Sequence, residues 1–266
     1  MKQKIFLFLF FSTITAICIA QTNDTLFNQV DAKGLKQGYW KKHYPNGNLQ
    51  YTGYFKNNKP LGEFKRYNRE GELLAIMDYP ENSSKIYTKI FYPNNQVQAE
   101  GFYINKQKDS IWQFFTENKI LVSKINFVLD KKHGLETRFF DNGDIFEKIE
   151  WKNGIQDGIT LRYYENGNVM IRATYNNGIL HGLYSSFNSN GKPIIYGKYE
   201  NNRREGKWIT YDESGKPKNE INYLNGIADN QEELDRIEQE EIEMLEKNKG
   251  KFIDPMEKMY NNIPPM

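Results

Sequence analysis

Residues 158–181 read GITLRYYENGNVMIRATYNNGILH, and this stretch decides the fold because its layout recurs every 24 residues. Each copy starts at or near a glycine, carries a turn sequence around its ninth residue and ends in a second turn sequence. A repeat of this length with two turns is one supersecondary unit, which stacks on its neighbours along the chain. Positions within a unit are numbered from its first residue, so that Gly158 is position zero.

Four positions recur from residue 38 to residue 229 without an insertion or deletion. Position zero and position 9 are each glycine in six of the eight units. Position 17 is aromatic in all eight units and position 5 in seven, although aromatic residues make up only 15% of the chain. The units start at Gly38, Gly62, Ile86, Ser110, Gly134, Gly158, Gly182 and Gly206.

Turn chemistry sets the secondary structure within each unit. Asn-Gly is a strong hairpin signal, because both residues tolerate a left-handed backbone. It occurs at position 9, as in Asn166-Gly167, and at the second turn, as in Asn177-Gly178. We therefore expect an all-β fold: a single elongated, twisted antiparallel meander of about eight 24-residue hairpin repeats, followed by a C-terminal α-helix. A leucine-rich repeat is excluded, because the chain has no leucine ladder.

The spacing also predicts the register of each hairpin. A two-residue first turn would place the ring at position 17 opposite position zero. We expect this ring to cover the exposed backbone of the glycine there, which would explain why both positions recur together. The aromatic residue at position 5 then falls on the other face, unless a bulge shifts the first strand. The sequence leaves these two alternatives open.

These residues resemble the MORN repeat, specifically the bacterial variant found in the YwqK-type antitoxin family. The matching stretches run from Gly38 to Leu49, from Gly158 to Val169 and from Gly206 to Gly215. The third and fourth units lack both glycines, so their turns depart from the family pattern. The resemblance implies a spacer or docking surface that binds other proteins or, in some members, lipid head groups. An antitoxin would bind its partner inside the cell. The amino terminus instead predicts export, so we do not expect an antitoxin role.

The amino terminus, residues 1–20, is typical of a secretory signal peptide. Lys2 and Lys4 precede an apolar run that ends at Ala20, and a membrane-spanning helix would need about 20 apolar residues. Ile17 precedes the only cysteine, Cys18, where a lipoprotein needs a small residue. We expect export to the periplasm, the cell surface or the medium, without lipidation and with no cysteine left after cleavage.

The remaining chain divides into a lead-in (21–37), the repeat array (38–229), an acidic amphipathic helix (230–250) and an irregular tail (251–266). Asn230 is the expected helix cap. Residues 229–266 carry a net charge of −6 and residues 38–228 a net charge of +6. We expect the helix to fold back over the last strand edge, around Tyr223 and Leu224, because an open edge favours aggregation.

The sequence predicts no catalytic residue, cofactor site or metal site, and hence no enzyme. His133 and His181 share one repeat position, and His43 takes position 5, so all three are interpreted as structural. A net charge of +2 argues against a nucleic-acid partner.

Two main binding functions and one minor one are left. The first is a protein-docking scaffold whose hot spots are the aromatic residues at position 2, although each ring could instead simply pack the sheet. The second is a glycan- or cell-wall-binding aromatic module. Anionic lipid is a third, minor possibility, supported by Lys41, Lys42, Lys65, Arg66 and Lys89 on the first three units. The aromatic candidates are Trp40, Phe64, Trp112, Tyr184 and Trp208.

Overall fold

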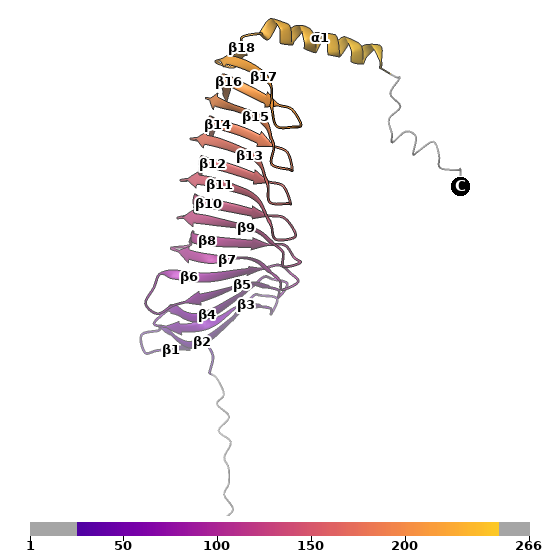
Figure 1. Ribbon diagram of the computed structural model, residues 1–266. Helices are drawn as coiled ribbons and strands as arrows, with labels where there is room; N and C mark the ends of the chain where they lie inside the picture. Colours follow the sequence, from indigo (N-terminus) through magenta and orange to yellow (C-terminus); the bar gives the residue numbers. More distant parts are fainter. Residues whose placement is uncertain (1–25, 250–266) are drawn as a thin grey trace, which may run out of the picture.

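The computed structural model describes residues 26–249 as one open antiparallel sheet followed by one helix (Figure 1). Each strand pairs with the next along the chain. The elements are β1 (Gln29–Val30), β2 (Lys36–His43), β3 (Leu49–Lys56), β4 (Lys59–Tyr67), β5 (Leu73–Tyr79), β6 (Lys85–Phe91), β7 (Val97–Ile104), β8 (Gln107–Phe115), β9 (Leu121–Val128), β10 (Lys131–Phe139), β11 (Ile145–Lys152), β12 (Ile155–Tyr163), β13 (Val169–Asn176), β14 (Ile179–Phe187), β15 (Pro193–Glu200), β16 (Arg203–Tyr211), β17 (Pro217–Leu224), β18 (Ile227–Ala228) and α1 (Gln231–Lys247).

The predicted fold class is confirmed. Strands β2 to β17 have seven to nine residues each and form eight hairpins, one for each 24-residue unit. The sheet is elongated and twisted, and its units follow one another from one end to the other (Figure 1). The first twenty residues and the tail after Gly250 lie outside the described residues, so the predicted signal peptide and irregular tail stay predictions.

The predicted register is confirmed, but the predicted two-residue first turn is wrong. In the first unit Gly38 pairs with Phe55, as expected, whereas the turn has three residues. Gly47 adopts a φ of 87° and donates its N–H to the Tyr44 carbonyl, while Asn46 is not left-handed. One extra residue in the second strand, Gln50, restores the register. Because this bulge lies in the second strand, the aromatic residue at position 5 does fall on the opposite face.

The glycines at position zero serve backbone conformation rather than ring packing. Position zero has a positive φ in seven units, including a φ of 60° at Ser110. A Cβ placed on Gly38, Gly62 or Gly206 would meet no atom within 4 Å, so no ring covers them. The expectation that the ring at position 17 fills this space was therefore wrong. The residue instead sits where an irregularity in pairing requires a left-handed backbone.

The third and fourth units keep the first turn without glycine. Asn95 and Lys119 occupy position 9 with φ values of 61° and 66°. The second turn has two left-handed residues in most units, as in Asn57 and Asn58. Between the second and third units this turn is replaced by the longer loop 80–84, which joins β5 to β6.

Turn side chains also tie one unit to the next. The Tyr44 hydroxyl donates to the carbonyl of Tyr67 at 3.0 Å, and Tyr164 repeats this bond with Phe187 at 2.9 Å. The Asn48 amide donates to the Arg69 carbonyl at 2.8 Å. Adjacent hairpins are therefore joined at their turns as well as along their strands.

The helix forms, but it does not cover the last strand edge. Asn230 precedes α1 without a side-chain capping bond, and no residue of α1 is buried. Leu224 is 75% exposed at the edge where a cap was expected. Figure 1 shows α1 pointing away from the array. The short strand β18 pairs with the end of β17 instead.

The opposite edge is covered by the lead-in. β1 pairs with the start of β2, and the Asn28 side chain accepts the N–H of Lys41 at 2.9 Å. Within residues 26–249, no helix is long and apolar enough to cross a membrane.

Candidate interaction surface

One face of the sheet is densely packed, and we call it the packed face. Its centre is a row formed by positions 2 and 15 of every unit, which pair across the strands. Most members of this row are buried, including Trp112 at 0% exposure and Glu136 at 2%. Large aromatic residues in this row have a small residue on at least one side, because neighbouring side chains share the space above the sheet.

The aromatic residues of this row lie over glycine or alanine. A Cβ on Gly101 would lie 2.5 Å from the Trp112 ring, and a Cβ on Gly197 would lie 2.2 Å from the Trp208 ring. Tyr184 pairs with Ala173. Where position 15 is larger, as at Ile149, the partner in the next unit is a small or flexible residue. The glycines at position 15 therefore make room for the rings.

A second recurring contact joins the residue at position 2 to the residue four positions before it. The cationic groups of Lys36, Lys108 and Arg204 lie 4.4, 5.1 and 4.6 Å from the ring centroids of Trp40, Trp112 and Trp208. In the fifth unit Glu136 replaces the ring, and Lys132 lies 2.6 Å from its carboxylate. The same repeat position therefore carries a basic residue, which makes a cation–π contact where position 2 is aromatic and an ion pair where position 2 is glutamate.

The middle of the packed face holds a chain of charges that the sequence did not reveal. Arg138 lies between Glu136 and Glu147, at 2.8 and 2.9 Å, and Arg162 lies 2.9 Å from Glu147. Burial raises the pKa of Glu136, but its ion pairs with Lys132 and Arg138 outweigh that effect and hold it below the ordinary 4.5. Both buried carboxylates are fully paired, so this chain serves the fold.

The predicted hot-spot residues all lie in the central row of the packed face, in strands β2, β4, β8, β14 and β16. They form no single site. Trp112 and Trp208 are 0% and 4% exposed, and their indole N–H groups donate to the carbonyls of Phe102 and Lys198. The expectation that these two rings anchor a partner is thereby corrected, because a partner cannot reach them. Trp40, Phe64 and Tyr184 are half-buried.

The opposite face, which we call the open face, offers the accessible surface. Position 1 places four large side chains there: Tyr39, Ile111, Leu135 and Leu183 are 53%, 58%, 47% and 53% exposed. We call these four residues the apolar row. They occupy the same repeat position in the first, fourth, fifth and seventh units, and Ile111 and Leu135 lie in adjacent units.

A basic row runs beside the apolar row. Its members, one from each of the first six units, occupy position 3 or position 14. Residues at these two positions pair with each other across neighbouring strands, so the basic residues follow one another along the sheet with other residues between them. They are Lys41, Lys65, Lys89, Lys124, Lys148 and Arg172.

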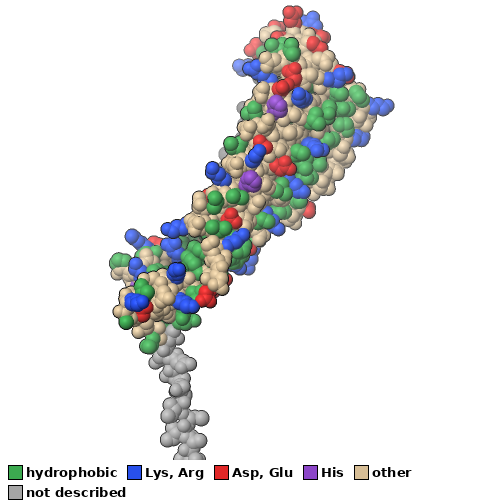
Figure 2. All heavy atoms as spheres, turned by 90° about the vertical axis from the view of Figure 1, so that its left-hand side faces the viewer, with side chains coloured by type: hydrophobic (Ala, Val, Ile, Leu, Met, Phe, Trp, Pro, Cys, Tyr) green, Lys and Arg blue, Asp and Glu red, His purple; other side chains and the backbone are tan. Residues whose placement is uncertain are grey.

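The two rows together are the open-face band. Lys42 and Arg66, predicted beside Lys41 and Lys65, point to the packed face instead, because adjacent strand residues alternate. Figure 2 shows Lys and Arg side chains distributed along the length of the array, with hydrophobic side chains between them.

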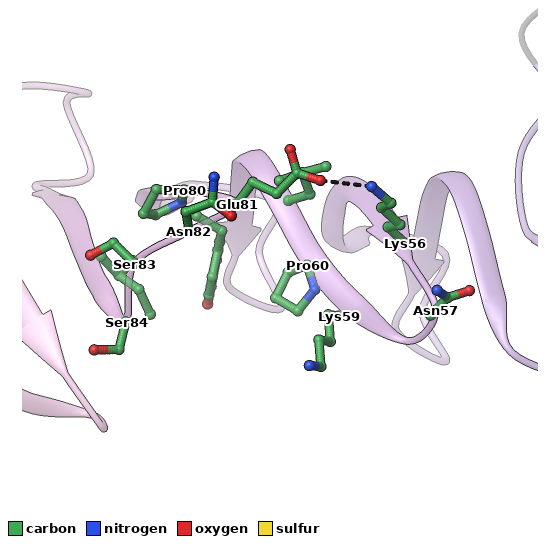
Figure 3. Close-up of a pocket in the computed structure, with 12 residues that line it drawn as sticks. Lys56, Asn57, Lys59, Pro60, Pro80, Glu81, Asn82, Ser83 and Ser84 are labelled. Atoms are coloured by element: carbon green, nitrogen blue, oxygen red, sulfur yellow. Dashed lines mark hydrogen bonds and ion pairs between the residues drawn. The ribbon is translucent and has the colours of Figure 1, made fainter.

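A hollow of about 690 Å³ lies where the loop 80–84 interrupts the repeat. Figure 3 shows Ser83 and Ser84 on one side of it and Lys56 and Lys59 on the other. Lys56 pairs with Glu81 at 2.6 Å, and this bond lowers the pKa of Glu81. Of the charged residues that line the hollow, Lys56 and Glu81 pair with each other and Lys59 is exposed at its edge, so the hollow is an open depression and not an enclosed site.

The histidines form no site in the structure. The ring Nδ1 of His133 lies 3.3 Å from the side-chain oxygen of Asn153, which is in the second turn of its unit. In the part of the chain that the structure describes, no group of three His, Cys, Asp or Glu side chains could hold a metal ion.

The fold and its surface define an open-sheet hairpin-repeat protein with one packed and one accessible face. The repeat itself is identified by comparison: six segments match the family model described as MORN repeat variant. They are residues 36–57, 87–105, 132–153, 156–177, 180–201 and 204–225. The second unit, with its longer loop, and the fourth, without both glycines, fall between the matches. No curated protein matches the chain.

Proposed function

We propose that this chain is an exported, non-enzymatic scaffold whose open face docks another protein of the cell envelope or the extracellular space. A scaffold for protein or lipid binding is what MORN repeats suggest in general. The resemblance to the YwqK-type family concerns the type of repeat, and no antitoxin function is proposed. Export rests on residues 1–20 of the sequence.

The observation that carries the proposal is the apolar row. Its exposed side chains recur at one position on several units, while the rings of the packed face are engaged in intramolecular contacts. Apolar residues beside a basic row supply both the burial and the charge steering that a protein interface uses.

Affinity capture tests this proposal. Residues 21–266 serve as bait for an envelope extract, and the recovered molecules are identified by mass spectrometry. The open-face variant is Ile111→Ser with Leu135→Ser, and the control variant is Ile155→Ser with Leu224→Ser, which are also exposed. One protein recovered with the native bait and the control, but lost with the open-face variant, is the expected result. Recovery that is equal with both variants would contradict the assigned face.

A glycan-binding module is the second candidate, and one observation favours it. Tyr39 and Tyr54 are exposed together on the open face, with ring centroids 5.2 Å apart. Recovery of glycan alone in the same capture, lost on Tyr39→Ser with Tyr54→Ser, would replace the protein partner with a glycan. Binding to anionic vesicles that high salt abolishes would point instead to lipid.

A further inference from the structure

We infer that helix α1 of one copy of this chain docks on the open-face band of a second copy, and that two copies exchange helices to form a dimer. The inference names an occupant for the surface on which the proposed function rests. Its test needs only the purified chain, so its failure would leave capture of another protein unaffected.

The donor is helix α1, none of whose residues is buried against the rest of residues 26–249. Ile237, Ile242, Met244 and Leu245 are 43%, 44%, 56% and 64% exposed. With Leu234 they form an apolar stripe along one side of the helix, on which Glu238 and Glu241 also lie. The helix carries eight acidic and two basic residues, so two copies of α1 would repel one another. The surface that covers this stripe must therefore be basic as well as apolar.

The acceptor has both properties. Lys124, Lys148 and Arg172 form no ion pair in the described structure, and they lie on successive units. The exposed side chains of Ile111 and Leu135 lie one row away. Rows on the same face are two residues apart along a strand, roughly 7 Å, which is less than the width of a helix. One helix can therefore cover both rows.

The spacing of charges also agrees. Successive units are two strands apart, about 9.6 Å. On α1, Glu233 and Glu240 are seven residues apart, about 10.5 Å along the axis, and both border the apolar stripe. A helix lying across the strands would bring its acidic residues into register with the basic residues of neighbouring units.

The reach of α1 decides between its own array and a second copy. The helix has 17 residues and is about 25 Å long, and it starts directly after β18. Lys124 lies on β9, nine strands before β18, which is roughly 43 Å, and Lys148 on β11 is roughly 34 Å away. Folded back, the helix would reach Arg172 at most. Only the helix of a second copy can engage Lys124 and Lys148.

Reciprocal docking gives a closed dimer in which both helices and both bands are used. Such a two-fold arrangement is the commonest symmetry of oligomers. Because its attraction rests on exposed charges, it should weaken steeply as salt rises.

Sedimentation equilibrium on residues 21–266 tests the inference. We expect a dimer at about 50 mM salt and a shift to monomer at about 500 mM. Lys124→Glu with Lys148→Glu should weaken dimerisation at least tenfold. The control variant, Lys131→Glu with Lys152→Glu, has the same change of charge at exposed residues next to the second turns. It should dimerise like the native chain. Circular dichroism confirms that both variants are folded.

A charge exchange distinguishes direct docking from an indirect effect. Glu233→Lys with Glu240→Lys should be monomeric alone, like the Lys124→Glu, Lys148→Glu variant. A mixture of these two variants should form a heterodimer, because both interfaces then pair opposite charges. A native chain that is monomeric at low salt, a dimer that survives removal of residues 230–266, or a mixture that stays monomeric would each overturn the inference.

Discussion

Replacing Gly101 with alanine tests whether the packed face is built by matching ring to glycine. The added Cβ would lie 2.5 to 2.6 Å from three atoms of the Trp112 indole, where ordinary contact requires at least 3.4 Å. The ring must therefore move by about 1 Å. It is fully buried and packs against Tyr103 and Phe114, so it has no free space to enter.

The cost follows from what the ring loses. Overpacking of this kind costs about 1–3 kcal/mol. The indole N–H donates to the Phe102 carbonyl at 2.9 Å, and breaking that bond in a buried site adds about 1–3 kcal/mol. We expect Gly101→Ala to destabilise this part of the array by about 2–6 kcal/mol. Without the ring the same change should be neutral or stabilising by about 0.5 kcal/mol, because alanine suits a strand better than glycine.

The assay is a double-mutant cycle read by hydrogen exchange at the amides of β7, β8 and β9. Local exchange is preferable to one melting curve, because units of a repeat array can open separately. Gly101→Ala is compared in the native chain and in the Trp112→Thr background, since Thr88 and Thr160 occupy the same position elsewhere. An equal loss of protection in both backgrounds would refute the ring-to-glycine argument.

Three more variants test the ion pairs, the turn hydrogen bonds and the helix. Glu136→Gln should destabilise the array at neutral pH. The native chain should lose this extra stability as the pH falls below 4.5, because the folded pKa of Glu136 is lowered, and urea unfolding at pH 7 and at about pH 3 should show the two proteins converging. Tyr44→Phe should cost about 1 kcal/mol, because the carbonyl of Tyr67 loses its donor; a melting point equal to native would contradict this role. Removal of residues 230–266 should leave the melting of the monomeric array unchanged, since no residue of α1 is buried; aggregation on heating would restore the capping role.

Much of the fold was predictable because each unit signals its own turns. The register from Gly38 to Phe55 followed from counting residues between turn sequences. The turn type did not follow, because Asn-Gly suits both a two-residue turn and a three-residue turn with a left-handed glycine. The three-residue turn shifts the register by one residue, and the bulge at Gln50 shifts it back. Counting residues between the two strands therefore gives the same register for both turn types.

The site was predicted less well, for a physical reason. Position 2 was recognised as a repeated aromatic position, but not as the most buried row of the sheet. Trp112 and Ile111 are neighbours in sequence, yet one is 0% and the other 58% exposed. Alternation along a strand predicts that they lie on opposite faces, but not which face becomes packed.

The sequence by itself determined the repeat, the strand order and the pairing register, because these depend on local turn chemistry and nearest neighbours. The tertiary structure decided what each face does. Burial on the packed face arises when residues from different units, such as Gly101 and Trp112, share one volume across the twisted sheet. The position of α1 was likewise beyond the sequence: an acidic, amphipathic helix specifies the kind of surface it needs, whereas only the fold shows that its own array leaves it uncovered.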